Sequence, residues 1–190
     1  MKKILVLGGG GFIGGHLAKK MKEQGNYVRV VDIKNHEYFS EKEMCDEFLV
    51  YDLRDPKNVE ACMRLEIDET GNISPFSYVK QPFSKEITFD EVYQLAADMG
   101  GAGYIFTGEN DANVMHNSAL INLNVVHECV KKKVGKVFYS SSACMYPEHN
   151  QLDPNNPNCE ESSAYPACLL YTSDRCRRRL RCRSRWSPYH

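Results

Sequence analysis

Two groups of residues in this 190-residue chain could do chemistry, and the first is a run of glycines. Gly8, Gly11 and Gly14 have the spacing GxxGxxG, and Gly9 with the last two also fits GxGxxG. Glycines between a strand and a helix let main-chain N–H groups and the positive end of the helix dipole face a pyrophosphate. Because such a string alone is a weak signal, its context decides the interpretation.

Asp32 supplies that context, since it lies 21 residues after Gly11. A carboxylate at this spacing can accept hydrogen bonds from both hydroxyls of a ribose, and it would repel a 2′-phosphate. The two features together predict a dinucleotide site that takes NAD in preference to NADP. The alternative is that Asp32 only caps a loop.

The second group consists of Ser142 and Cys144, which follow an apolar run at 136–139. Strand ends line the crevice where open α/β sheets bind ligands, so position alone makes both residues candidates. A thiol with a pKa of about 8.5 can exchange protons near neutral pH, as general acid–base catalysis requires. The alternative is that Cys144 is a small buried hydrophobe.

Strands and helices must position these residues, and the sequence alternates between the two. Ile4–Leu7 is a continuous aliphatic run, as expected of a strand that is covered on both faces. Further strands are predicted at 27–31, 48–51, 92–95 and 136–139, with helices from about 12, 56 and 113. The alternation predicts an α/β fold: a Rossmann-type doubly wound parallel sheet in the order 3-2-1-4-5, of which the chain holds the N-terminal part only.

Several segments together resemble a known family. They are GGGGFIGGHLAKK at 8–20, VVD at 30–32, DL at 52–53, LAADMGG at 95–101 and FYSSSACMYPE at 138–148. Over residues 1 to about 167 the chain resembles the extended short-chain dehydrogenases/reductases. The last two motifs are narrower, and they resemble the GDP-mannose 3,5-epimerases and their near relatives.

The resemblance implies roles for particular residues. Gly100 and Gly101 match a loop that approaches a nucleotide-sugar substrate. Ser142 matches a hydroxyl that hydrogen-bonds the reacting sugar, and Cys144 matches a thiol acid/base. The residues that the resemblance implies for NAD binding are Gly8, Gly11, Phe12, Ile13, Gly14, Asp32, Asp52, Leu53, Leu95, Ala96 and Ala97.

The activity that the resemblance implies is NAD-dependent epimerisation of a GDP-mannose-like nucleotide sugar through a transient 4-keto intermediate. GDP-fucose synthases and nucleotide-sugar 4,6-dehydratases share the early motifs, but the Cys144 segment favours the epimerase. The family's Tyr-x-x-x-Lys motif is absent: Tyr171 is followed by Arg175 at the lysine position, and a guanidinium does not replace an ammonium. The resemblance also implies a sugar-binding domain that this chain lacks. We therefore expect the activity in the parent protein and not in this chain. The second hypothesis is a non-catalytic fragment that binds NAD.

Charge divides the chain into two parts. Residues 1–167 contain 14 lysines and three arginines, with a net charge of −7, whereas 168–190 contain seven arginines and no lysine, with a net charge of +6. We interpret 1–167 as an incomplete NAD-binding domain and 168–190 as a non-native or disordered tail; an Arg-rich nucleic-acid tail is the less favoured alternative. The polar segment at about 64–89 is predicted to be a surface insertion that the sheet does not need.

Composition bears on location and partners. No stretch approaches the roughly 18 apolar residues that cross a bilayer, so we expect no membrane partner. The eight cysteines form no CxxC pair, which argues against a metal site. Free thiols without an export signal favour the cytoplasm. The expected partners are a nucleotide-sugar substrate and, for the parent protein, a second copy in a homodimer, with no nucleic acid.

Overall fold

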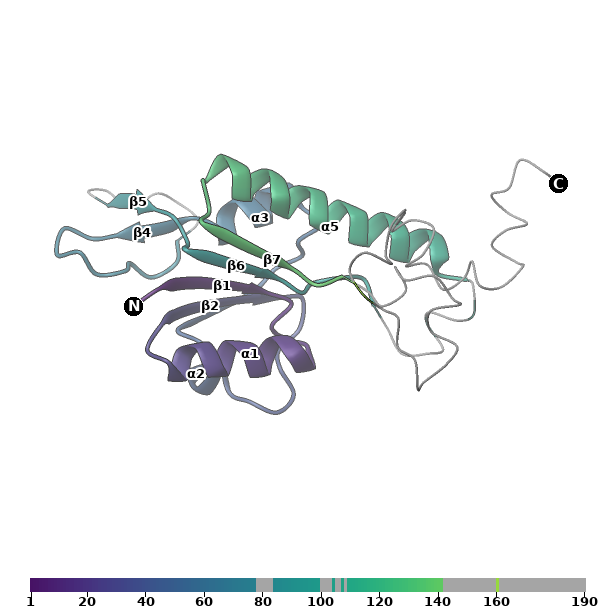
Figure 1. The fold of residues 1–190 in the computed structure, drawn as a ribbon, viewed down its shortest axis with the longest axis horizontal. Coiled ribbons are helices and arrows are strands. Elements are labelled where there is room, and N and C mark those ends of the chain that lie inside the picture. Colours follow the sequence, from purple (N-terminus) through teal and green to yellow (C-terminus); the bar gives the residue numbers. More distant parts are fainter. Residues whose placement is uncertain (78–83, 100–103, 105–106, 108, 142–159, 161–190) are drawn as a thin grey trace. The chain divides into compact units, whose positions relative to one another are not determined.

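The computed structural model describes residues 1–77, 84–99, 104, 107, 109–141 and 160 (Figure 1). The chain divides into two compact units, of which the first comprises Met1–Asp98 and Met115–Tyr139. This first unit contains the sheet and its helices, and it is the part considered below. None of the described helices is long and apolar enough to span a bilayer.

The central element is a five-stranded sheet in which every neighbouring pair is parallel. Its order is β3-β2-β1-β6-β7, which confirms the predicted order 3-2-1-4-5 and the Rossmann-type fold. The first strand is central, and its residues Ile4–Leu7 are aliphatic and buried. The strands are β1 (Lys3–Leu7), β2 (Tyr27–Asp32), β3 (Glu47–Val50), β6 (Glu91–Gln94) and β7 (Lys136–Tyr139).

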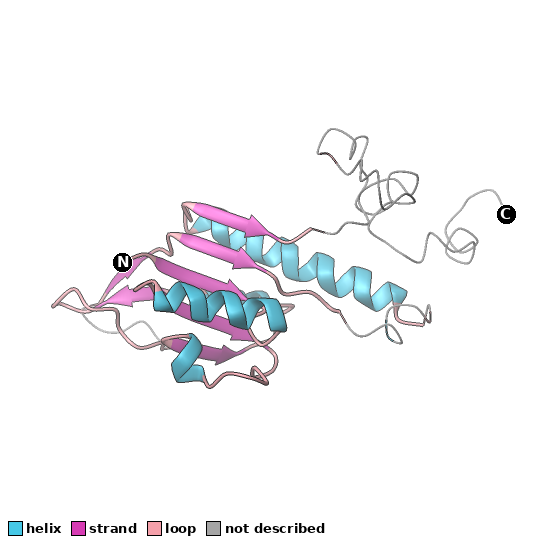
Figure 2. Ribbon diagram, turned by 60° about the horizontal axis from the view of Figure 1, so that its bottom comes forward, coloured by secondary structure: helices cyan, strands magenta, loops and turns pink. Residues whose placement is uncertain are grey.

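Helices cover both faces of this sheet (Figures 1 and 2). One face carries α1 (Phe12–Glu23) and α2 (Glu41–Met44), and the other carries α3 (Pro56–Cys62) and α5 (Asp111–Lys131). The core beneath α1 includes Ile4, Val6, Ala18, Val28, Val30 and Met44. The core beneath α3 and α5 includes Leu5, Leu7, Val31, Val59, Val92, Ile121 and Val125. Alternate residues of β1 and β2 thus face opposite cores, as a strand period of two requires.

The segment predicted as a surface insertion places residues in the core, so its surface placement was wrong; that the sheet can fold without it stays a prediction. Leu65–Ile67 forms β4 and pairs antiparallel with β5, Lys85–Ile87. At the two ends of the segment, Leu65 is 0% exposed and Phe89 is 1% exposed, and both lie in the core beneath α5. Because the middle of the segment is polar, the sequence did not indicate that these two apolar residues are buried. Residues 78–83 lie outside the described part.

A buried arginine joins the sheet to this hairpin. Arg29 on β2 is 1% exposed, and its Nε donates to Oε2 of Glu47 on β3 at 2.7 Å. Its Nη1 donates to the carbonyl oxygens of Cys62 at 2.9 Å and Arg64 at 2.5 Å. One guanidinium therefore links two strands, the end of α3 and the start of the hairpin.

Two aromatic rings complete the surroundings of Arg29. Its guanidinium carbon lies 5.4 Å from the ring centroid of Phe76 and 5.3 Å from that of Phe89, within the range of a cation–π contact. Glu47 is held further by the hydroxyl of Tyr27, at 2.5 Å, and by the main-chain N–H of Phe76, at 2.6 Å. The buried charge is thus paired and its partner is hydrogen-bonded on both oxygens.

Candidate functional site

The glycine-rich turn connects β1 to α1 at the carboxyl edge of the sheet. Gly8 has a φ of +87°, and a Cβ there would lie 2.6 Å from the main-chain N of Ala96. A Cβ on Gly14 would lie 2.2 Å from the carbonyl oxygen of Gly8. Glycine is therefore required at Gly8 by conformation and at both positions by close approach of the backbone.

Gly11 differs from these two because its α-carbon faces open space. A Cβ at Gly11 would meet nothing closer than the carbonyl oxygen of Gly8, at 3.4 Å. Gly11 is also the N-cap of α1, where no side chain caps the helix and the first turn holds no acidic residue. The positive end of the helix thus borders a space that a pyrophosphate could enter, which fits the predicted use of the turn.

Asp32 lies at the end of β2 beside this turn, as the spacing predicted. Its Oδ2 accepts a hydrogen bond from the main-chain N–H of Gly10 at 2.8 Å, and its Oδ1 accepts one from Lys34 N–H at 3.2 Å. The alternative role, that of a loop cap, is therefore a real one. A carboxylate has about four acceptor positions, so these two bonds leave acceptor capacity for ribose hydroxyls. The role of Asp32 in cofactor choice stays a prediction.

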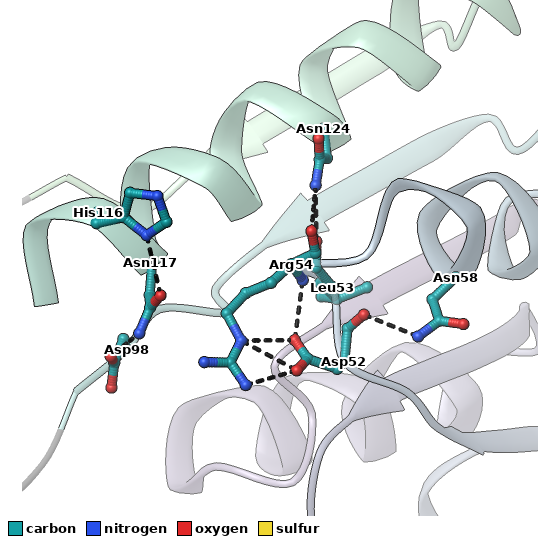
Figure 3. A network of polar contacts seen from close by, with 8 residues as sticks. All are labelled: Asp52, Leu53, Arg54, Asn58, Asp98, His116, Asn117 and Asn124. Carbon is teal, nitrogen blue, oxygen red and sulfur yellow. Dashed lines mark hydrogen bonds and ion pairs between the residues drawn. The ribbon is translucent and has the colours of Figure 1, made fainter. Parts of the chain in front are cut away.

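Asp52 follows β3, next to the end of β2, and is held by its neighbour Arg54 (Figure 3). The Arg54 side chain donates through Nε to both carboxylate oxygens, at 3.0 Å each, and through Nη2 to Oδ2 at 2.6 Å. The main-chain N–H of Arg54 adds a bond to Oδ1 at 2.9 Å. These bonds lower the pKa of Asp52 and keep it a charged acceptor.

The residues after β6 approach the glycine turn. Leu95 and Ala96 are partly buried in the two cores, and the Leu95 N–H donates to the Leu7 carbonyl oxygen at 2.9 Å. Ala97 is exposed. Phe12 and Ile13, at the start of α1, are 68% and 70% exposed. The structure thus brings the residues predicted to bind NAD to one edge of the sheet, while their individual contacts with NAD stay predictions.

The predicted catalytic and substrate residues lie outside the described part of the chain. This applies to Gly100, Gly101, Ser142 and Cys144; Tyr171 and Arg175, which were not predicted to be catalytic, also lie outside it. The three cysteines of the described part are free and buried. Burial raises the pKa of the Cys45 and Cys62 thiols to about 12 and that of Cys129 to about 11, so none of these three is a candidate acid/base at neutral pH.

Sequence reasoning missed several polar residues that shape this edge. Arg54 could have been noticed, since an arginine two residues after a strand-end aspartate can reach its carboxylate. Asn58, Asn117 and Asn124 carried no signal in the sequence, because their partners are main-chain or side-chain groups of loops contributed by other segments.

Comparison with known proteins identifies the family. The sequence profile of the NAD dependent epimerase/dehydratase family matches residues 4–178. The chain belongs to this family. The family is described as NAD dependent, which agrees with the predicted cofactor.

Within the epimerase/dehydratase family, the chain is similar in sequence to GDP-mannose 3,5-epimerases. It is 36% identical over 165 residues to GDP-mannose 3,5-epimerase from Arabidopsis thaliana and, to the same extent, to GDP-mannose 3,5-epimerase 1 from Oryza sativa subsp. japonica. The match covers 87% of the chain and 37% of each relative, so the chain spans just over a third of their length.

Solved structures agree on the fold. The UDP-Glc/GlcNAc 4-epimerase of Campylobacter jejuni superimposes with a TM-score of 0.61 at 22% identity, over 99% of this chain and 50% of that one. A UDP-glucose-4-epimerase from Stenotrophomonas maltophila with bound NAD gives a TM-score of 0.53 at 19% identity, over 77% of this chain and 39% of that one. At these identities the likeness establishes the Rossmann-type architecture of the family member.

Proposed function

We propose that this chain provides the NAD-binding part of a nucleotide-sugar epimerase whose substrate is GDP-mannose or a close analogue. The observation that carries the proposal is the uncapped glycine turn beside Asp32, in a chain 36% identical to GDP-mannose 3,5-epimerases. The turn supports NAD binding, and the identity supports the class of sugar nucleotide.

NAD would contact this edge of the sheet at three places. The start of α1 would receive the pyrophosphate, since no side chain caps its main-chain N–H groups. Asp32 would accept bonds from the adenosine ribose. Asp52 would accept a bond from the 6-amino group of adenine. Arg54 makes two hydrogen bonds to each Asp52 oxygen, so that amine would share an oxygen with Arg54.

The chemistry at the sugar would divide between cofactor and protein. NAD, when bound, supplies reversible removal of hydride from a sugar carbon. The Cys144 thiol would exchange a proton at the acidified carbon beside the resulting ketone, and the Ser142 hydroxyl would hydrogen-bond the reacting sugar. Gly100 and Gly101 would let the main chain approach the nucleotide sugar.

Two measurements test this function in sequence. Titration with NADH, followed by nicotinamide fluorescence, should show saturable binding, with NADPH bound more weakly. The protein is then incubated with NAD and GDP-mannose in deuterium oxide. NMR should detect no deuterium in the sugar ring for this chain, because Arg175 stands at the lysine position of the Tyr-x-x-x-Lys motif, and should detect it for the parent protein. Cys144→Ala should stop this exchange and leave NADH affinity unchanged if the thiol is the acid/base.

The outcomes separate the proposal from its alternative. Exchange in the parent protein that only the substrates of GDP-fucose synthases or of dehydratases support would contradict the epimerase. NADH binding by this chain without exchange is the expected result for a chain with Arg175 at the lysine position. Exchange that depends on Tyr171 would show that Tyr171 and Arg175 form a working pair. Absence of NADH binding would contradict the cofactor site itself.

A further inference from the structure

The loop after β3 is held from outside by an asparagine of α5. The Asn124 Nδ2 donates to the carbonyl oxygen of Leu53 at 3.2 Å and to that of Arg54 at 3.0 Å (Figure 3). These partners are 71 and 70 residues away in sequence. One side-chain amide therefore fixes two consecutive peptide groups directly after Asp52.

The carbonyl oxygen of Asp52, at the start of the loop after β3, also accepts hydrogen bonds. The Asn58 Nδ2, on α3, donates to the Asp52 carbonyl oxygen at 3.0 Å, and the Asp55 N–H donates to the same oxygen at 3.2 Å. Each carbonyl oxygen from Asp52 to Arg54 thus has a donor. Because the peptide groups are fixed, the direction in which Asp52 and Arg54 leave the main chain is fixed too.

The same helix also holds the end of β6. The Asn117 Nδ2 donates to Oδ2 of Asp98 at 2.7 Å, and the Asp98 N–H donates to the Ser118 hydroxyl at 3.2 Å. Asn117 and Asn124 lie two helical turns apart on α5. The helix therefore contacts both the loop after β3, which carries Asp52, and the loop after β6, which carries Asp98.

We propose that Asn124 is a positioning residue for the adenine of NAD. It acts through the Leu53 and Arg54 peptides, which aim the Asp52 carboxylate at the 6-amino group. The inference rests on the proposed cofactor site, and it adds a residue that does not itself touch NAD. Loss of the Asn124 amide frees the loop, so discrimination at the 6-position of the base should decline.

The test compares two ligands that differ at that position. Reduced nicotinamide hypoxanthine dinucleotide carries an oxygen where NADH carries the 6-amino group, so it cannot donate to Asp52. The unmodified protein should prefer NADH about tenfold, as a charged hydrogen bond warrants. In Asn124→Ala the ratio of the two dissociation constants should approach one. Water can replace the lost donor because the Arg54 carbonyl lies at the surface, so this variant should still fold.

A control separates positioning from simple destabilisation. Lys131→Met removes two ion pairs, with Glu60 of α3 at 3.2 Å and with the buried Glu128 at 3.0 Å, and it does not touch the β3 loop. It should lower the unfolding midpoint and leave the base preference at its original value. If Asn124→Ala also keeps that preference, or if the unmodified protein binds NADH with no preference, the positioning role is refuted. If the unmodified protein binds neither ligand, the proposed cofactor site fails first.

Discussion

Replacing Arg29 by methionine should cost the protein about 3 kcal/mol of its free energy of unfolding. Methionine retains much of the apolar stem but none of the donors. The variant would leave Glu47, 17% exposed at its side chain, without its cationic partner. It would also leave the carbonyl oxygens of Cys62 and Arg64 without the donor they share. Removal of one partner of a buried ion pair costs about 3–5 kcal/mol of the free energy of unfolding.

We place the expected loss at the lower end of that range for a structural reason. The hydroxyl of Tyr27 and the N–H of Phe76 continue to donate to Glu47 in the variant, so its charge is only partly uncompensated. Part of the stability lost in Arg29→Met should return when the negative charge of Glu47 is also removed. The double variant Arg29→Met with Glu47→Gln should therefore be less destabilised than the sum of the two single variants.

Equilibrium unfolding in urea, read by circular dichroism, measures these differences. Lys34→Met is the matched control, because Lys34 and Glu37 form an ion pair at 3.7 Å with both side chains more than half exposed. Such a pair contributes between about 0 and 1 kcal/mol. If Arg29→Met cost no more than this control, the linkage of the hairpin to the sheet through Arg29 would be refuted.

Three further predictions concern the carboxyl edge of the sheet and the buried thiols. Gly11→Ala should fold like the unmodified protein but lose NADH binding, whereas Gly8→Ala should lower the thermal midpoint, because only Gly8 combines a φ of +87° with a 2.6 Å approach; equal midpoints would contradict this. Asp32→Ala should weaken NADH binding by about 1–3 kcal/mol in a fluorescence titration, since a charged acceptor is lost; unchanged affinity would argue for a loop cap alone. Iodoacetamide at pH 8 should leave the thiols of Cys45, Cys62 and Cys129 unmodified in the native protein. Burial holds their pKa values well above that pH, and only thiolates react. Labelling of any of the three, detected by peptide mass spectrometry, would contradict this.

Local patterns were enough to predict the sheet, because its strands carry their own signal. Ile4–Leu7 is an unbroken aliphatic run, and every residue of it is buried in β1. The turn from Gly8 to Gly14 was predictable for a similar reason: its glycines and the strand before it are contiguous in sequence. Asp32 was predictable from spacing alone.

The parts that sequence reasoning missed depend on groups that meet only in the folded chain. Arg29 stands in a strand like any other charged residue, and its burial depends on Glu47 and on carbonyl groups more than 30 residues away. The hairpin of β4 and β5 was missed because Leu65 and Phe89 are isolated apolar residues in a polar segment. Asn124 is one asparagine among several on α5, and only the position of the β3 loop gives it a partner.

The bond from Gly10 to Asp32 limits how this site could be re-engineered for NADP. Removal of the carboxylate would relieve repulsion of a 2′-phosphate, but it would also take the acceptor from the Gly10 N–H. A redesign would have to supply a neutral acceptor of similar reach, such as the carbonyl oxygen of an asparagine, before adding a cation for the phosphate. The Asp32 side chain therefore has two roles: it holds the glycine turn through Gly10, and it is proposed to set the preference for NAD over NADP.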